Sequence, residues 1–289
     1  MSKFILSAFA DEICPELDGQ MDELVKYGIK HIELRGVDGK NVADLTLEEA
    51  GDVLRRMRAR GFAVSALGSP IGKVPVEEPF EPHLERFRHT LRLAQALDTP
   101  YIRLFSFFIQ PDNDPAAHRE EVLRRLRVFA DEAEAAGITL LHENEKHIYG
   151  DTAERCRDIL VGVGSPALWA TYDPSNFVQC GERNWPYAYE LLKDKIRYVH
   201  MKDSVSVDES AEADTGFDTA VVSDAHRPVG QGDGNCREIL ADLWRTGYEG
   251  FLSIEPHLAN NDSIPGTGAD KFAAAAKALI ALVAEVTDQ

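Results

Sequence analysis

Cysteine is scarce in this sequence of 289 residues, and its four copies are scattered. Cys14, Cys156, Cys180 and Cys236 form no Cys-x-x-Cys pair, so the spacing of a zinc cluster or of a disulfide framework is absent. Isolated cysteines of this kind are typical of proteins from a reducing compartment. We therefore expect a cytoplasmic protein.

Basic residues and long apolar runs are also in short supply. The chain has 31 lysine and arginine residues against 49 aspartate and glutamate residues, a formal net charge of −18. Such a surface repels phosphate backbones and anionic lipids. No stretch reaches the roughly 18 apolar residues of a membrane-spanning helix, and Asp11 and Glu12 interrupt the N-terminal apolar run. We therefore expect the protein to bind neither nucleic acid nor membranes.

Short β-type runs alternate with longer segments of helical period along the whole chain. A length of 289 residues with 44% hydrophobic content suits one large α/β domain better than two ordinary ones. About eight strand and helix pairs predict a single (β/α)8 TIM barrel over residues 1–289. The expected strands cover residues 4–9, 31–34, 62–67, 101–105, 138–143, 169–173, 198–200 and 251–255.

The segments between these strands carry helix-end signals. Thr46 followed by Glu49 is the pattern of a capping box, and apolar residues recur at helical spacing from Leu47 to Met57. Four expected helix-to-strand joints have a glycine directly before an apolar residue, which is typical of a helix that ends in left-handed backbone. These glycines are Gly28, Gly61, Gly137 and Gly247.

One polar and acidic segment, at about residues 204–227, interrupts the alternation. It follows the strand at residues 198–200 and is too polar for a core. Long loops after barrel strands are typical of lids or insertions at the rim where catalytic groups lie. We expect this insertion at the same rim as the candidate site.

Four expected strands end in side chains able to bind a metal ion: Glu143, Asp173, His200 and Glu255. A parallel barrel buries the body of each strand and exposes groups at its C-terminal end. Taken singly, each residue has a simpler explanation, namely an exposed glutamate, a core histidine, or an aspartate that caps a turn. Taken together, three oxygens and one nitrogen form a hard site for a divalent cation.

Other polar residues near the strand ends are candidates to contact a substrate. Arg103 lies within an expected strand, and a buried arginine requires a carboxylate partner, for which Glu33 is a candidate. Asp203 is a candidate to orient the imidazole of His200 or the neighbouring Lys202. The full set of substrate-binding candidates is Glu33, Arg35, Lys73, Arg103, Asn176, Lys202, Asp203 and His257.

Five short motifs, in this order along the chain, resemble those of the xylose isomerase-like TIM barrels. They are ENE at Glu143, DPSN at Asp173, HMKD at His200, PVGQGDGN at Pro228 and SIEPH at Ser253. The resemblance covers essentially the whole chain. It implies one divalent metal ion held by Glu143, Asp173, His200 and Glu255, with Mn²⁺ as the first expectation and Mg²⁺, Co²⁺ or Zn²⁺ as alternatives. It also implies a homo-oligomer, either a dimer or a tetramer.

The resemblance further implies an isomerase or epimerase of a sugar or sugar-like hydroxy-carbonyl compound. Glu143 and Glu255 would be the catalytic acid and base, acting beside a carbonyl polarised by the metal, through an enediolate. A lyase, an inosose- or dehydroshikimate-type dehydratase, is the alternative on the same metal site. The sequence does not choose between isomerisation, epimerisation and dehydration.

Two less favoured alternatives share the barrel. An apurinic-site endonuclease is suggested by the Asp-x-His spacing of Asp224 and His226, but Ser69, Phe107 and Asn176 stand where its three-metal cluster requires histidines. The acidic charge also opposes DNA binding. A non-catalytic sugar-binding barrel is the other alternative, because a fold alone does not prove activity.

Overall fold

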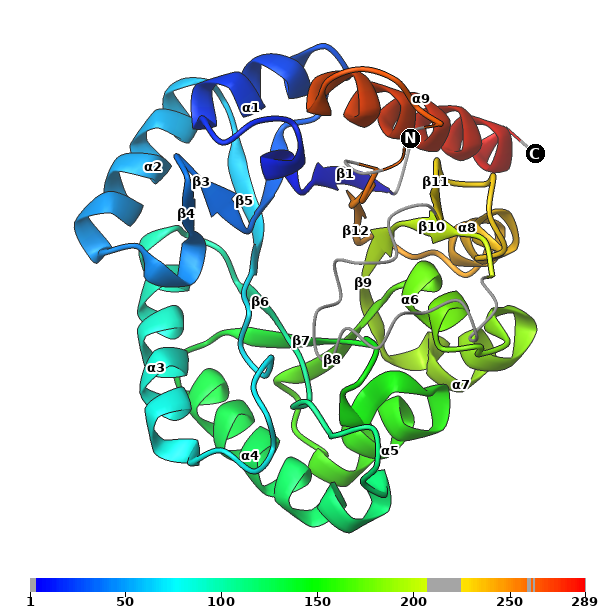
Figure 1. Cartoon of the computed structure of the whole chain (residues 1–289). Helices are drawn as coiled ribbons and strands as arrows, with labels where there is room; N and C mark the ends of the chain where they lie inside the picture. Colours follow the sequence, from blue (N-terminus) through cyan, green and yellow to red (C-terminus); the bar gives the residue numbers. More distant parts are fainter. Residues whose placement is uncertain (1–3, 207–224, 259–260, 262, 289) are drawn as a thin grey trace.

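The computed structural model describes residues 4–206, 225–258, 261 and 263–288. Eight parallel strands form a barrel surrounded by helices (Figure 1). In chain order the strands are β1 (Ile5–Ala8), β2 (His31–Leu34), β5 (Ala63–Gly68), β6 (Tyr101–Leu104), β7 (Thr139–Glu143), β8 (Leu168–Tyr172), β9 (Ile196–Met201) and β12 (Phe251–Ile254). The predicted (β/α)8 TIM barrel is confirmed, and every strand begins and ends within about two residues of its prediction.

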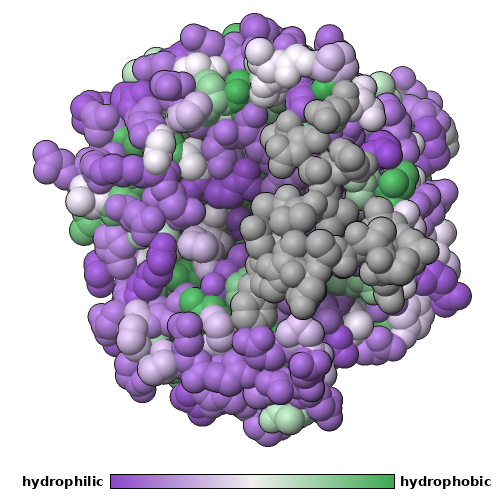
Figure 2. Space-filling model, in the orientation of Figure 1, coloured by the Kyte–Doolittle hydropathy of each residue, from purple (hydrophilic) through white to green (hydrophobic). Residues whose placement is uncertain are grey.

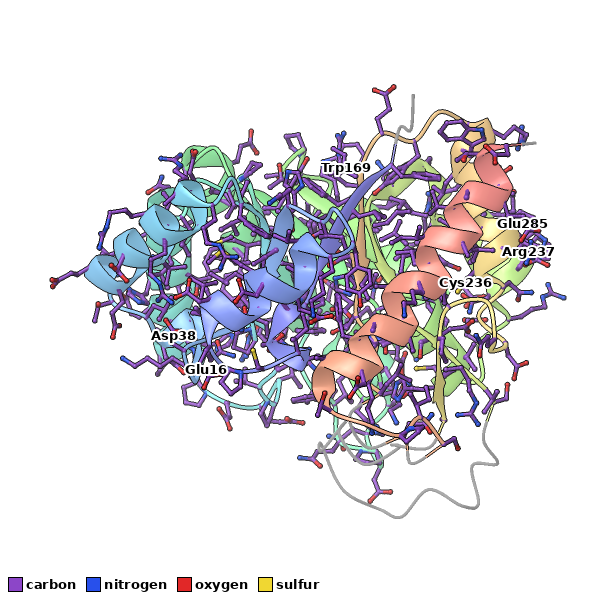
Figure 3. All side chains as sticks on the ribbon, turned by 90° about the horizontal axis from the view of Figure 1, so that it is seen from above. Glu16, Asp38, Trp169, Cys236, Arg237 and Glu285 are labelled. Atoms are coloured by element: carbon purple, nitrogen blue, oxygen red, sulfur yellow. The ribbon has the colours of Figure 1, made fainter. Side chains whose placement is uncertain are left out.

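The helices and short elements follow the strands in the usual alternation. The α-helices are α1 (Leu17–Val25), α2 (Leu47–Ala59), α3 (Phe80–Ala96), α4 (Pro115–Ala135), α5 (Ala153–Val163), α6 (Pro174–Gln179), α7 (Tyr189–Leu192), α8 (Cys236–Arg245) and α9 (Gly268–Thr287). Shorter helical turns are η1 (Ala10–Glu12), η2 (Val42–Asp44), η3 (Tyr149–Asp151), η4 (Asn184–Ala188) and η5 (Lys193–Lys195). In the side view, Arg237 of α8 and Glu285 of α9 form an ion pair on the outside of the barrel (Figure 3).

The barrel closes where the first strand meets the last. β1 pairs with β12 in parallel register, with Ile5 opposite Phe251, and β12 in turn pairs with β9. On its other side β1 lies next to β2. Arg35, just after β2, binds both carboxylate oxygens of Asp11, which follows β1, at 2.8 and 3.1 Å. An ion pair therefore joins the C-terminal ends of these two strands.

The helix-end signals of the sequence are largely confirmed. Thr46 and Glu49 form a capping box at the start of α2. The four joint glycines all have positive φ angles, between +70° and +81°. Leu47 is the exception in the apolar stripe of α2, because it is 47% exposed. As the first residue of the helix it points away from the barrel wall that Ala50 and Met57 cover.

The barrel interior is layered from apolar to charged. Leu141 and Tyr198 pack with Ala66 in a small buried cluster inside the barrel. Two residues further along the same strands, with side chains on the same face, come Glu143 and His200. On the inner face of β7 and β9, the residue that packs in the apolar cluster is therefore followed directly by a polar residue of the candidate site.

The predicted insertion can be followed only at its ends. β10 (Asp203–Ser204) pairs antiparallel with β11 (His226–Arg227), so the chain leaves and re-enters at adjacent points. Residues 207–224, including Asp224, lie outside the described residues. Among the described helices, none combines the length and apolar character needed to cross a bilayer.

Gly72 lies where the loop after β5 passes the end of β6. Its φ is +89°, and a β-carbon there would lie 2.1 Å from the carbonyl oxygen of Phe105. We expect Gly72→Ala to lower the free energy of unfolding by more than about 3 kcal/mol, because the backbone must move. Gly39→Ala is the matched control, since Gly39 has φ +79° but no atom within 4 Å. Its loss should be only about 1 kcal/mol in urea unfolding. Equal losses would contradict the steric explanation.

His83 of α3 should make stability depend on pH. Its Nε2 accepts the backbone N–H of Gly72 at 2.8 Å, and burial lowers the pKa of His83 to about 4 from 6.5. In the unfolded chain His83 therefore becomes protonated near pH 6.5, whereas in the folded chain it becomes protonated only near pH 4. The free energy of unfolding therefore decreases as the pH falls through this window. Between pH 7 and pH 5 the loss should be about 2 kcal/mol.

The variant His83→Gln keeps an acceptor for Gly72 but cannot titrate. In urea unfolding at pH 7, 6 and 5 the wild type should lose about 2 kcal/mol more than this variant. Parallel pH profiles of the two proteins would show that His83 does not remain neutral in the folded state.

Candidate metal centre

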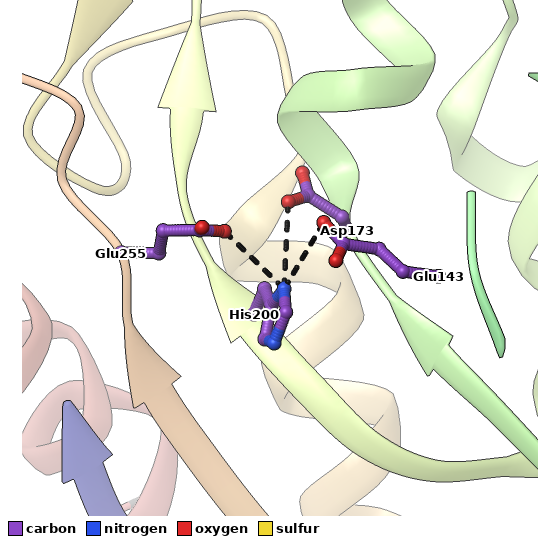
Figure 4. A group of neighbouring side chains, drawn as sticks. All are labelled: Glu143, Asp173, His200 and Glu255. Carbon is purple, nitrogen blue, oxygen red and sulfur yellow. Dashed lines mark ion pairs between the residues drawn. The ribbon is translucent and has the colours of Figure 1, made fainter. Parts of the chain in front are cut away.

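Four consecutive strands of the barrel deliver the predicted ligand residues to one point. Glu143 ends β7, Asp173 directly follows β8, His200 lies in β9 and Glu255 directly follows β12. These strands are neighbours in the sheet, and the four residues are all buried. One ligand atom from each lies within 4.8 Å of the others (Figure 4). The predicted set is therefore brought together.

Glu33 orients the imidazole of His200 so that Nδ1 points into the cluster. Its Nε2 lies 3.1 Å from each carboxylate oxygen of Glu33. Since a carboxylate only accepts, Nε2 carries the proton and donates it to Glu33. The other ring nitrogen, Nδ1, then faces Glu143 and Glu255, each at 3.2 Å. The prediction that Asp203 orients this imidazole is wrong, because Glu33 does so from inside the barrel.

Asp173 has two roles, one for each carboxylate oxygen. Oδ1 accepts the backbone N–H of Asn176 at 2.9 Å and caps α6, as the turn-capping alternative predicted. Oδ2 faces the cluster, 3.8 Å from His200 Nδ1 and 2.9 Å from Lys202 Nζ. Asn144 fixes the backbone of Asp173 with both ends of its amide, at 2.9 and 3.0 Å.

Each glutamate of the cluster is held by an arginine. Arg103 donates to Glu143 Oε2 at 2.9 Å, and Asn176 donates to Glu143 Oε1 at 3.1 Å. The predicted pairing of Arg103 with Glu33 is therefore wrong. Arg103 lies on β6, directly beside β7, whereas β2 with Glu33 is two strands away.

Besides His200, Glu255 contacts three positively charged or titratable groups. Arg35 donates to Oε1 at 3.2 Å, and Lys202 lies 3.3 Å from Oε2. His257 Nε2 lies 3.4 Å from Oε1, and its Nδ1 lies 3.0 Å from Glu12. These contacts hold the carboxylate from both sides of β12, since Arg35 follows β2 and Lys202 follows β9.

Two orphaned polar atoms test whether the residues fit a metal ion. His200 Nδ1 and Asp173 Oδ2 are buried and make no hydrogen bond, although both lie at ion-pair distance from charged neighbours. Buried polar atoms are normally satisfied, so an exception calls for a ligand or another explanation. The spacing suits a small cation, because ligands about 2.1 Å from an ion lie about 3 to 4 Å from one another. One nitrogen and three carboxylates fit Mn²⁺, Mg²⁺ or Zn²⁺.

Burial and neighbouring charges shift the pKa values of three residues in this cluster. Burial raises the pKa of Asp173 to about 7, against the opposing effect of Lys202. For His200, burial lowers the pKa, but the charges of Glu33, Glu143 and Glu255 outweigh it and raise the pKa well above its ordinary value. Burial would likewise lower the pKa of Lys202, yet Asp173 and Glu255 raise it. Positive charge is therefore already concentrated where a cation would bind.

The two glutamates stay ionised in spite of burial. Burial alone would raise the pKa of Glu143, but His200 and Arg103 lower it below its ordinary value. The pKa of Glu255 is lowered well below the usual range, because Lys202, His257 and His200 outweigh burial. Both side chains are therefore negatively charged at neutral pH in the metal-free protein.

The remaining predicted substrate-binding residues are engaged by the protein itself. Lys73 lies 2.9 Å from Glu145. Asp203 accepts backbone N–H groups from Gly230, Gly232 and Gly234 at 2.8, 3.0 and 2.9 Å. It holds the glycine-rich loop at residues 228–235 in place, and a β-carbon at Gly232 would lie 2.4 Å from its Oδ1. Contact of these residues with a substrate stays a prediction.

Three residues near the site escaped the sequence reasoning. Phe9 packs against His200, Glu12 binds Arg35 and His257, and Asn144 fixes Asp173. Only Asn144 had a usable signal, because it lies between two glutamates at a strand end.

The molecular face in Figure 2 is hollowed near its centre, and strongly hydrophilic side chains line the hollow.

A parallel barrel that gathers three carboxylates and an imidazole at its strand ends defines a class of TIM barrels with a candidate metal centre. The chain belongs to the xylose isomerase-like TIM barrel family, whose model matches residues 21–282. The predicted family is confirmed. No curated protein matches the sequence.

Solved structures with the same fold cover nearly the whole chain. One is the IOLI protein with a binding zinc atom, with a TM-score of 0.77, 16% identity, and coverage of 98% of this chain and 99% of that one. Another is the probable 3-DHS dehydratase AsbF of Bacillus anthracis, with a TM-score of 0.74, 19% identity, and coverage of 96% and 99%. A D-tagatose 3-epimerase-like protein has a TM-score of 0.72, 18% identity, and coverage of 98% and 99%. At these identities the likeness shows the fold.

Proposed function

We propose that this protein is a divalent-metal-dependent isomerase or epimerase of a sugar or sugar-like hydroxy-carbonyl compound. The observation that carries the proposal is the arrangement of two ionised glutamates around His200. Glu143 and Glu255 approach its Nδ1 from opposite sides, each at 3.2 Å (Figure 4). A compound bound between them would have one carboxylate on each side.

The chemistry follows from this placement. A divalent ion held by Glu143, Asp173, His200 and Glu255 would polarise the substrate carbonyl and lower the cost of deprotonating the adjacent carbon. One glutamate would then remove the proton from that carbon, and the other, after taking up a proton from solvent, would deliver it to the opposite face, which inverts the configuration. Return to the neighbouring carbon instead interconverts an aldose and a ketose. Arg103 and Arg35 hold the two carboxylates ready for these transfers.

Several features support the remaining parts of the proposal. A D-tagatose 3-epimerase-like protein and a zinc-binding protein share the fold, which favours an epimerase with a bound metal ion. We propose Mn²⁺ first, with Mg²⁺, Co²⁺ or Zn²⁺ as alternatives. We further propose a cytoplasmic dimer or tetramer that acts on a small carbohydrate-like substrate, with neither nucleic-acid nor membrane partners.

A dehydratase is the second candidate function. The probable 3-DHS dehydratase AsbF shares the fold, and the same site would serve this reaction. After one glutamate removes the α-proton, transfer of that proton to a β-hydroxyl would let it leave as water and give an unsaturated product in place of an isomer. Product analysis separates the two functions.

The proposed function is tested by hydrogen exchange with solvent. The wild-type protein with Mn²⁺ is incubated in D₂O with a panel of ketoses, keto-inositols and their phosphates. We expect an α-hydrogen of at least one compound to be replaced by deuterium, seen by NMR and mass spectrometry, and this exchange to stop when a chelator removes the metal. A metal-loaded protein that exchanges no member of the panel would overturn the proposal.

A further inference from the structure

A stack of alternating cationic and aromatic side chains forms one wall beside the candidate metal centre. The guanidinium groups of Arg35 and Arg103 lie 4.6 and 5.5 Å from the centre of the Phe9 ring. Arg103 and Lys73 lie 4.5 and 4.4 Å from the centre of the Phe105 ring. Cations within about 6 Å of a ring centre are attracted to it. We call these five residues the cation–aromatic ladder.

Each cation of the ladder also holds a glutamate. Arg35 donates to Glu255 at 3.2 Å, and Arg103 donates to Glu143 at 2.9 Å. Lys73, at the end of the ladder, donates to Glu145 at 2.9 Å. The two glutamates of the proposed acid and base pair are therefore connected through one shared ring, that of Phe9.

Phe9 also touches the third member of the centre. Its ring meets that of His200 edge to face, with centroids 5.1 Å apart and an interplanar angle of 79°. Phe9 itself is fully buried, at 0% exposure. A single aromatic ring thus contacts His200 and the arginine partners of both glutamates.

Gly68, the last residue of β5, leaves the space that the ladder occupies. A β-carbon there would lie 2.6 Å from Phe9 Cε1, 3.1 Å from Arg35 Cβ and 3.3 Å from Arg103 Nη2. All three contacts are to ladder residues. A methyl group at this position would therefore push on the ladder without removing a charge or a ligand.

We propose that the cation–aromatic ladder is a positioning device in which Phe9, through Arg35 and Arg103, fixes the separation of Glu143 and Glu255. This separation sets the affinity for the divalent ion and the rate of proton transfer. The catalytic half of the inference rests on the proposed function. The metal-binding half rests on the contacts alone, so the two can fail separately.

The test uses two variants that leave every metal ligand and every charge in place. Phe9→Leu removes the shared ring, and Gly68→Ala displaces it. In isothermal titration calorimetry, both variants should show a Kd for Mn²⁺ that is raised about 10- to 100-fold. This is the range seen when residues that orient metal ligands are replaced. In substrate exchange, kcat should fall with KM nearly unchanged, because alignment of the glutamates is lost while the pocket remains.

The matched control is Phe87→Leu. Phe87 is equally buried but packs on Phe129, with ring centroids 4.3 Å apart, between α3 and α4. Its replacement should lower stability as Phe9→Leu does, yet leave the Kd for Mn²⁺ unchanged. This comparison separates positioning from a general loss of packing, and Gly68→Ala serves if Phe9→Leu does not fold.

The outcomes are distinct. Binding of Mn²⁺ by Phe9→Leu and Gly68→Ala within about twofold of the wild type would overturn the proposal, since partners that position metal ligands change affinity by far more. An equal rise of the Kd in Phe87→Leu would also overturn it. Weaker binding in both variants, together with no exchange of any substrate by the wild type, would support the ladder and reject the proposed function.

Discussion

Replacing Glu255 by glutamine should lower the rate of α-hydrogen exchange about 10²- to 10⁴-fold, the usual contribution of a positioned acid or base. The amide keeps the size and the contact with Arg35 through its oxygen, but it cannot take up a proton at neutral pH. Glu143→Gln should have an effect of similar size if the two glutamates act on opposite faces. The measurement is single-turnover exchange in D₂O at saturating Mn²⁺.

Metal loading must be checked in these variants, because each replaced residue is also a candidate ligand. Bound Mn²⁺ is counted by atomic absorption before each exchange assay. Glu132→Gln is the control, since Glu132 pairs with Arg88 on the outside of the barrel. A fully loaded Glu255→Gln protein that exchanges at the wild-type rate would remove Glu255 from the acid and base pair.

Lys202→Met should destabilise the metal-free protein by about 3 to 5 kcal/mol, the usual cost of breaking a buried ion pair. Lys202 is 3% exposed and lies 2.9 Å from Asp173 and 3.3 Å from Glu255, so its loss leaves two buried carboxylates without this cation. A bound divalent ion supplies positive charge to the same carboxylates. The loss should therefore shrink strongly at saturating Mn²⁺, and Mn²⁺ should bind more tightly to the variant.

The two states are compared by urea unfolding in a chelator and in excess Mn²⁺. Arg125→Met is the control, because Arg125 is also buried but pairs with Glu121 within α4, on the outer layer of helices. Its loss should be smaller and equal in both conditions. If Lys202→Met loses as much stability with Mn²⁺ as without it, Lys202 and the ion do not share the same carboxylates.

Features that depend on residues close together in the sequence, such as helix caps and turns, could be predicted. The capping box at Thr46 and the left-handed glycines at the helix ends depend on a few adjacent residues, and they appear as predicted. The strand-end ligands were also predictable, because a parallel barrel collects the C-terminal ends of its strands at one rim. Local pattern and fold class together placed Glu143, Asp173, His200 and Glu255.

The side-chain pairs inside the barrel could not be predicted from the sequence, because they depend on the order of the strands and on the width of the barrel. Arg103 lies opposite Leu141 in the β6–β7 register, so Glu143, two residues on, is its natural partner. Glu33 reaches His200 from β2, which is not hydrogen-bonded to β9 in the sheet. Nothing in the sequence measures that distance across the interior. The hydrogen bonds of Asp203 to the glycine loop depend in the same way on a backbone path that residue types do not encode.

The pairing of the first strand with the last bears on how the protein is made. Ile5 meets Phe251, so a ribosome must release all the residues between them before β1 has its partner on this side. Glu255 follows directly on that final barrel strand, so the fourth candidate ligand is made after the other three. Until then Glu143, Asp173 and His200 belong to an open sheet. Neither the closed cylinder nor the complete set of candidate ligands can form before β12 has been made, and both are completed in that late step.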